Sequence, residues 1–268
     1  MGNRYNLRLT FLKTTISRAA VGAAHIISIY NVKRTVLYVN TQFEEPPFGG
    51  PNMPLHSHAR FFNALDKYPP VDIYADGVLI ARNLAYGDFT DYISVQPGIY
   101  DIVLYPTGET ENPIGSTTES FSVGRSFTVV AVDTDDSISI YKIHEPYQPL
   151  ASGLRSYMRL INLSKSPTPL DAFLQNGAKV FENVGFEELS SYNRFTPNIY
   201  TMTVKSSGSD KPLLVVPNLN LTPGKVYSVY IIGDPNGNPP LEARFVSDSE
   251  VESQHMSMKQ GLDFRRKI

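Results

Sequence analysis

The densest group of side chains that could bind a metal ion is a short acidic stretch after an apolar run. Asp133, Asp135 and Asp136 lie close together there, and Ca²⁺ is bound by several such oxygen ligands in a loop. A later segment that aligns with this one, residues 233–237, reads Gly-Asp-Pro-Asn-Gly, which is an ordinary turn sequence. We therefore expect an acidic turn at this point, with a Ca²⁺ site as the alternative.

Two other groups of residues could bind a ligand or take part in catalysis. His56 and His58 could place two imidazoles on one side of an extended segment, but no third histidine lies nearby in the sequence to complete a metal site. Asp72 and Asp171 recur at matching positions, where a catalytic carboxylate would need a second titratable partner. We favour a solvated linker for the histidines, and a turn-bonding or sheet-surface role for the aspartates.

Several classes of enzyme lack their signature in this chain. The sequence contains no Cys, which excludes disulfides, thiolate nucleophiles and iron–sulfur clusters. It also contains no Gly-x-Ser-x-Gly elbow and no glycine-rich phosphate loop. We therefore expect no catalytic residues, no cofactor and no resident metal ion, and we predict that the protein is not an enzyme.

The chain contains an internal repeat with an offset of about 100 residues, in which residues 58–145 align with residues 157–246. The clearest matched pairs are Arg60 and Arg159, Asp72 and Asp171, Gly77 and Gly177, Tyr92 and Tyr192, and Tyr100 and Tyr200. A repeat of this length is too long for a solenoid unit. Each copy is therefore expected to be a domain of its own.

Within each copy the apolar residues alternate with a period of two. Val71 and Ile73 precede an Asp-Gly pair at residues 76–77, which is a strong signal for a β-hairpin. Residues 127–132 and 227–232 are almost entirely apolar, as in a central strand that is buried on both faces. We therefore predict an all-β protein with two tandem antiparallel β-sandwich domains.

The predicted domain organisation follows from composition. We expect an N-terminal arm and Pro/Gly linker, a first sandwich, a linker, a second sandwich and a polar tail, over residues 1–57, 58–146, 147–156, 157–246 and 247–268. Residues 1–57 carry 6 basic and 2 acidic side chains, and residues 58–146 carry 5 and 13. This uneven charge favours a contact between arm and first domain, or acidic loops that only maintain solubility.

The N-terminal arm contains two segments that favour a strand, residues 26–30 and 35–39. Their candidate assembly residues are Ile26, Ser28, Tyr30, Val36, Leu37, Tyr38 and Val39. Residues 14–24 could instead form a short helix, and residues 19–30 resemble the apolar part of a signal peptide without a clear cleavage site. No apolar run reaches the ~18 residues of a membrane-spanning helix, so we expect no membrane span.

The spaced motifs resemble domain-of-unknown-function family 4397 of bacteria. The motifs that carry the resemblance lie at residues 60–63, 70–74, 77, 83–86 and 97–100. The second copy departs from the pattern, with Ala172 and Phe173 in place of Val-Tyr and Asn198 in place of Gly. The resemblance implies Ig-like or prealbumin-like sandwiches on bacterial surfaces, without enzymatic activity. Tandem copies without a clear signal peptide are similar to clostridial spore or cell-surface proteins.

Three functional hypotheses follow, and the first accounts for most of these features. It is a structural spore- or cell-surface protein that forms a homo-oligomer or polymer when its arm adds to a neighbour's sheet edge. The second is a tandem module that binds a surface glycan or a protein. The third is an enzyme, for which no convergent titratable groups are visible. The net charge of −2 argues against a nucleic-acid partner.

Overall fold

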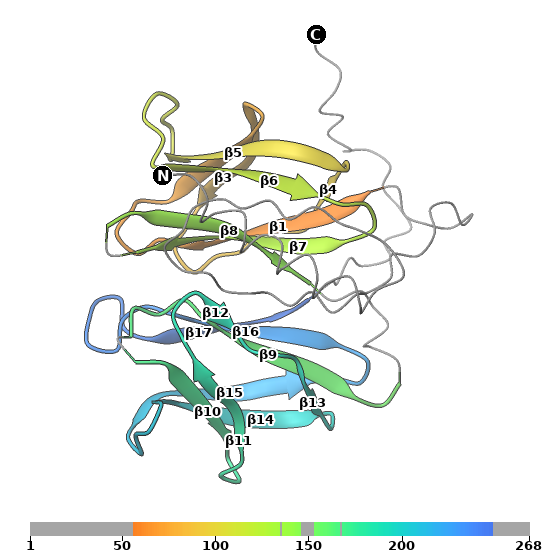
Figure 1. Ribbon diagram of the computed structural model, residues 1–268, viewed down its shortest axis with the longest axis vertical. Coiled ribbons are helices and arrows are strands. Elements are labelled where there is room, and N and C mark those ends of the chain that lie inside the picture. Colours follow the sequence, from red (N-terminus) through yellow and green to blue (C-terminus); the bar gives the residue numbers. More distant parts are fainter. Residues whose placement is uncertain (1–55, 135, 146–152, 167, 249–268) are drawn as a thin grey trace, which may run out of the picture. The chain divides into compact units, whose positions relative to one another are not determined.

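The computed structural model of the chain describes residues 56–134, 136–145, 153–166 and 168–248. These residues form 17 β-strands and no helix, which confirms the all-β prediction (Figure 1). The candidate arm residues Ile26, Ser28, Tyr30, Val36, Leu37, Tyr38 and Val39 lie outside the described residues, so their strand character stays a prediction.

The first copy of the repeat folds into two four-stranded sheets. Its strands are β1 (Ser57–Ala64), β2 (Val71–Ala75), β3 (Val78–Leu84), β4 (Ile93–Val95), β5 (Gly98–Pro106), β6 (Gly115–Phe121), β7 (Ser126–Asp133) and β8 (Ile138–His144). One sheet has the order β4-β1-β7-β8 and the other β3-β2-β5-β6 (Figure 1). Phe61 and Phe127 of the first sheet meet Ile73 and Ile102 of the second in one buried core.

The second copy repeats this arrangement. Its strands are β9 (Ser156–Asn162), β10 (Leu170–Leu174), β11 (Lys179–Val184), β12 (Glu188–Leu189), β13 (Asn193–Phe195), β14 (Asn198–Ser206), β15 (Pro212–Leu221), β16 (Val226–Ile232) and β17 (Glu242–Ser247). Its sheets have the orders β12-β9-β16-β17 and β11-β10-β14-β15, and β13 also pairs with β9. Leu160 and Val229 pack against Ala172 and Val204 in its core.

The predicted hairpin at the Asp-Gly pair is present. Asp76 and Gly77 adopt φ angles of 48° and 76° between β2 and β3, as a tight hairpin turn requires. The second copy turns more widely, because the Gly177 N–H donates to the Leu174 carbonyl and only Gly177 has a positive φ in that turn. The same sequence signal therefore gives hairpins of two lengths.

One strand pair in each sandwich differs from the antiparallel prediction. β1 runs parallel to β7, and β9 runs parallel to β16, while the other strand pairs are antiparallel. Turn signals in a sequence report only strands that are joined by a short loop. β1 and β7 are instead separated by five strands, so their direction was not visible in local sequence.

The two central strands are buried on both faces, as their apolar sequences predict. In β7, Phe127 and Val129 point into the core of the first sandwich, while Val130 and Val132 point to the opposite face. On that face they join a separate apolar cluster that includes Tyr230 of β16. The cluster joins the β4-β1-β7-β8 sheet to the β12-β9-β16-β17 sheet, and we call it the interdomain core.

Aromatic rings from both sandwiches meet in the interdomain core. Phe62 stacks on Phe89 with a centroid distance of 4.0 Å, and the Tyr230 ring lies 5.0 Å from Phe62 and 5.2 Å from Phe89. Offset and edge contacts of this kind stabilise beyond simple area burial. The two sandwiches accordingly belong to one compact unit.

Candidate functional site

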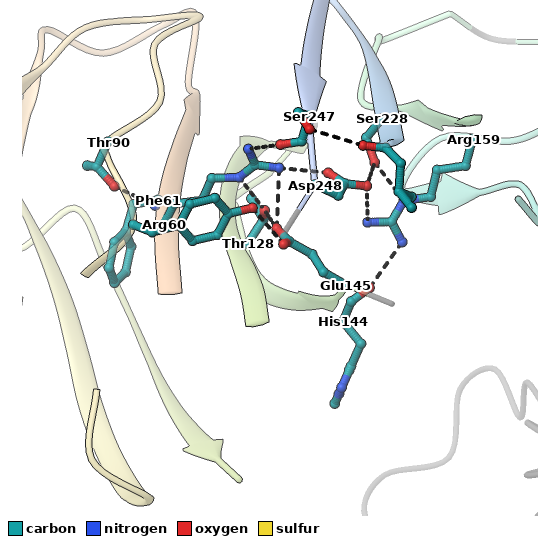
Figure 2. A network of polar contacts seen from close by, with 12 residues as sticks. Arg60, Phe61, Thr90, Thr128, His144, Glu145, Arg159, Ser228, Ser247 and Asp248 are labelled. Atoms are coloured by element: carbon teal, nitrogen blue, oxygen red, sulfur yellow. Dashed lines mark hydrogen bonds and ion pairs between the residues drawn. The ribbon is translucent and has the colours of Figure 1, made fainter. Parts of the chain in front are cut away.

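Two buried arginines from matching positions of the repeat lie beside the interdomain core. Arg60 on β1 is 5% exposed and Arg159 on β9 is 2% exposed. Charged side chains are rarely buried this far unless they are paired. Figure 2 shows how both guanidinium groups point into one network of polar groups.

Arg60 binds groups from both sandwiches. Its Nε donates to Thr128 Oγ1 at 2.9 Å, and its Nη2 lies 3.3 Å from the Glu145 carboxylate. The same Nη2 donates to Asp248 Oδ1 of the second sandwich at 2.8 Å, and Nη1 donates to the Ser247 carbonyl at 2.9 Å. Arg60 thus joins its own sandwich to the last described strand of the other (Figure 2).

Arg159 makes the matching contacts in the opposite direction. Its Nε donates to Ser228 Oγ at 2.7 Å, and its Nη2 lies 3.5 Å from Asp248 in the same sandwich. Its Nη1 donates to the His144 carbonyl of the first sandwich at 3.1 Å. His144 and Ser247 each end the last strand of a copy. Each arginine therefore donates a hydrogen bond to the equivalent strand end of the other sandwich.

Each buried carboxylate is also held by hydroxyl groups of its own sandwich. Tyr92 donates to Glu145 at 2.6 Å, and Tyr192 donates to Asp248 at 2.6 Å. Burial raises the pKa of both tyrosines, and the neighbouring carboxylate raises it further. The phenols therefore stay protonated and act as donors. Their rings also lie 4.8 Å from the Arg60 guanidinium and 4.6 Å from that of Arg159.

The sequence indicated only half of this network. The repeat singled out Arg60, Arg159, Tyr92 and Tyr192, but the carboxylates were not recognised as their partners. A usable signal was present, because Glu145 and Asp248 each follow the last strand of a copy. Asp248 lies two residues beyond the boundary predicted for the second sandwich, and it is buried within that sandwich.

Further polar contacts link the two sandwiches near the interdomain core. Lys165 Nζ lies 2.5 Å from Asp66 and 3.7 Å from Asp133. Arg244 Nε donates to the Gly87 carbonyl at 2.7 Å. These contacts add to the arginine network in holding the sandwiches together.

The acidic cluster that could have bound Ca²⁺ is divided by the structure. Asp133 is buried and accepts the Asp66 N–H at 2.7 Å, and burial raises its pKa. Asp136 is exposed, and Asp135 lies outside the described residues. Within the described ranges, no three His, Asp or Glu side chains are grouped so that they could hold a metal ion.

The repeated aspartates fix backbone turns. Asp72 accepts the N–H groups of Asn83 at 2.8 Å and Gly108 at 3.1 Å, and Asp171 accepts the Asn183 N–H at 2.8 Å. Asn83 and Asn183 have φ angles of 53° and 55°, where the hairpin strands shift register. Of the two roles expected from the sequence, this is the turn-bonding one; both aspartates are buried and do not lie on the sheet surface.

Two small cavities lie inside the first sandwich. One of about 20 Å³ is lined by apolar side chains, among them Phe61 and Ile102. A smaller one of about 10 Å³ has Ile73 and Leu104 among its lining residues. Neither of these two cavities brings titratable groups together. The arginine network joins buried charged groups of both sandwiches, and its contacts hold the two sandwiches together.

The outer sheets present their own side chains to solvent. On the β3-β2-β5-β6 sheet, the partly exposed rings of Tyr74 and Tyr105 meet edge to face at 5.4 Å. On the matching sheet of the second copy, the Phe173 ring lies under Lys205 and Lys179. Ile99 and Ile199 occupy equivalent positions and are 72% and 57% exposed.

Fold and interface together define a tandem β-sandwich protein whose two domains share a core. The family model described as Domain of unknown function (DUF4397) matches residues 57–173 and 156–258. These matches span more than half of the chain, which therefore belongs to the DUF4397 family. No curated protein matches the sequence. The described residues also contain no helix long and apolar enough to cross a membrane.

Three solved structures show a distant likeness. The family 26 carbohydrate-binding module CBMbc of Eubacterium rectale Amy13K, solved with maltoheptaose, is 8% identical, with a TM-score of 0.25 over 71% of this chain and 96% of its own. The Bacillus anthracis TIE protein is 7% identical, with a TM-score of 0.22 over 66% and 33%. A candidate cell adhesion protein of Bacteroides fragilis is 10% identical, with a TM-score of 0.18 over 69% and 84%. At these TM-scores the likenesses carry no argument about function.

Proposed function

We propose that the protein is a non-catalytic structural protein of a bacterial spore or cell surface. Its copies assemble when the N-terminal arm of one chain adds as a strand to a sheet edge of the next. The observation that carries this proposal is the accessible apolar edge formed by β3.

Among the described strands, β3 pairs with β2 alone, so its other edge is unpaired. Its sequence, Val-Leu-Ile-Ala-Arg-Asn-Leu, contains one charged residue, and Val78 is 37% exposed. Natural edge strands are usually protected by lysine, proline or a covering segment, because an open edge accepts a strand from another chain. β3 has neither lysine nor proline, although its shift in register at Asn83 shortens the regular edge.

The arm has the properties that such an edge requires. Residues 35–39 read Thr-Val-Leu-Tyr-Val, which favours an extended strand. The arm carries a net charge of +4 and the first sandwich −8, so their contact is electrostatically favourable. A contact between an arm and a different surface of the next chain is heterologous. It therefore propagates into a fibre or layer unless the rotation closes a ring.

Electron microscopy of the purified full-length chain tests this proposal. We expect negative stain to show regular fibres, rings or layers. Leu37→Pro should abolish them, because proline cannot donate a strand hydrogen bond. Gln42→Pro, outside the strand-forming segment of the same arm, is the matched control and should still assemble. A uniform field of single particles from the parent chain, or unchanged polymers from Leu37→Pro, would contradict the proposal.

A second candidate function is a tandem module that binds a protein partner. The observation that favours it is the repeated exposure of Ile99 and Ile199 at the same place in both copies. Two equivalent contacts on one rigid unit would raise the overall affinity without new contacts. Under this alternative, the double variant Ile99→Ser/Ile199→Ser would lose retention by a bacterial surface fraction, and each single variant would weaken it. Equal retention of parent and double variant would exclude this pair as the contact.

A further inference from the structure

One aromatic position on the outer sheet has different neighbouring side chains in the two copies. In the second copy, the Phe173 ring lies beneath two ammonium groups, with Lys205 Nζ at 4.8 Å and Lys179 Nζ at 5.6 Å from its centre. A cation over an aromatic face is attracted by the negative potential of the ring. Lys179 also forms an ion pair with Asp171 at 2.8 Å. This face thus carries its own cations.

The first copy replaces both lysines with uncharged residues. Tyr74 corresponds to Phe173. Leu79 lies opposite Tyr74, as Lys179 lies opposite Phe173, so Leu79 takes the place of Lys179. Tyr105 pairs with Asp72, as Lys205 pairs with Asp171, so Tyr105 takes the place of Lys205. Arg82 on β3 interacts electrostatically with Asp72. However, no lysine or arginine of the described ranges lies over the Tyr74 or Tyr105 ring.

Carboxylates border this uncovered aromatic face. Asp101 lies on β5 next to the turn that carries Asp76, and the Asp76 N–H donates to the Asp101 carbonyl at 2.9 Å. Both residues are exposed. The equivalent residues in the second copy are Thr201 and Gln175, which are uncharged and make the matching hydrogen bond. The first copy therefore combines two partly exposed rings with negative charge, where the second copy has one ring beneath two lysines.

We propose that the Tyr74–Tyr105 face of the first sandwich receives a lysine or arginine side chain from the basic arm of a second copy, namely Lys33 or Arg34. This inference rests on the proposed assembly and adds a side-chain contact on β2 and β5, beside the β3 edge that receives the arm. Two features support it. In the second copy, lysine side chains lie over the equivalent ring. The arm and the first sandwich also have opposite net charges.

Cross-linking between chains tests the acceptor. Equal amounts of unlabelled and ¹⁵N-labelled full-length chain are mixed and treated with a carbodiimide, which joins a lysine amine to a carboxylate. Mass spectrometry should find Lys33 coupled to Asp76 or Asp101 of the other chain. Cross-links to carboxylates of the second sandwich, or only within one chain, would overturn the inference.

A substitution taken from the second copy provides the decisive variant. Tyr105→Lys installs the cation that Lys205 supplies at the matching position. The new ammonium group should lie over the Tyr74 ring of its own chain and lower the yield of the Lys33 cross-link about fivefold. Tyr105→Phe keeps the ring and is the control. Circular dichroism confirms that each variant is folded. An unchanged cross-link yield in a folded Tyr105→Lys chain would also overturn the inference.

The double variant Lys33→Gln/Arg34→Gln tests the same contact from the arm. It leaves the folded sandwiches unaltered and should weaken association between chains. The outcomes separate the two proposals. Polymers that depend on Leu37 but show cross-links elsewhere would refute this acceptor alone. Cross-links from Lys33 to Asp101 between chains that form no polymer would refute the assembly proposal alone.

Discussion

Arg60 Nη2 and Asp248 Oδ1 lie 2.8 Å apart, although the two residues are separated by 188 positions in the sequence. The contact is buried and joins the first strand of one sandwich to the residue after the last strand of the other. A buried ion pair adds little net stability compared with a well-packed apolar pair, but removal of one partner leaves an uncompensated charge. Loss of either partner should therefore lower the stability of both sandwiches.

Replacement of one arginine should expose this dependence. Arg60→Met removes the cation that faces both Glu145 and Asp248, and we expect the free energy of unfolding to fall by about 3–5 kcal/mol. Urea denaturation followed by circular dichroism measures the change. Arg82→Met, at an exposed position on β3, should change it by less than about 0.5 kcal/mol. Equal losses in the two variants would contradict the assigned role of Arg60.

The shared core predicts that the two sandwiches unfold together. We expect one calorimetric transition for the parent chain, because the aromatic cluster and the arginine network span both sandwiches. The double variant Arg60→Met/Arg159→Met should separate this into two transitions. Two well-resolved transitions in the parent chain would show that the interdomain contacts do not couple the sandwiches.

Two glycines with the same backbone angle distinguish strain from steric clash. Gly233 and Gly108 both have a φ of 86°. A Cβ at Gly233 would overlap the backbone carbonyl of Pro240, whereas one at Gly108 would meet nothing within 4 Å. Both Gly→Ala variants should lose about 1 kcal/mol from the left-handed backbone, and Gly233→Ala should lose several kcal/mol more in thermal or urea unfolding. Similar losses would refute the proposed clash.

Acid should weaken the hairpin turns in both sandwiches. Burial acts to raise the pKa of Asp72, but the hydrogen bonds from Asn83 and Gly108 outweigh it and hold the pKa below the ordinary value. In Asp171, burial is likewise outweighed by the hydrogen bond from Lys179. A lowered pKa in the folded state gives stability that is present above the unfolded pKa and is lost as the pH falls through the folded one.

We therefore expect the free energy of unfolding to decrease below about pH 4. Asp72→Asn should flatten this decrease when urea denaturation is repeated between neutral and acid pH. Asp91→Asn, at an exposed position, serves as the control and should leave the slope unchanged. A parent chain with equal stability at pH 3 and pH 7 would contradict the assigned role of Asp72 and Asp171.

Much of the fold could be predicted from local sequence. Alternation around Val71 and Ile73 gave the strand, and the Asp-Gly pair gave the hairpin, because both signals act over a few residues. The double burial of β7 was also visible in its apolar sequence. What covers its second face was not visible, since Val130 lies in a buried cluster whose other members, such as Tyr230, come from the second copy as well.

The candidate site was harder to predict for the same reason. Arg60 and Tyr92 recur in the repeat, but a recurring residue does not name its partner. Asp248 was assigned to a polar tail because the surrounding sequence is charged, and only the packing of the two sandwiches places it beside Arg60. The parallel pairing of β1 with β7 was missed because no turn joins these strands.

A distance measurement between the sandwiches tests the central claim that the two domains form one locked unit. The chain has no Cys, so Ser116→Cys on β6 and Asn220→Cys on β15 allow clean attachment of two nitroxide labels. Pulsed electron–electron double resonance should give one narrow distribution of distances between the labels, and Arg60→Met should broaden this distribution. A broad distribution in the chain that retains Arg60 would show that the sandwiches move independently.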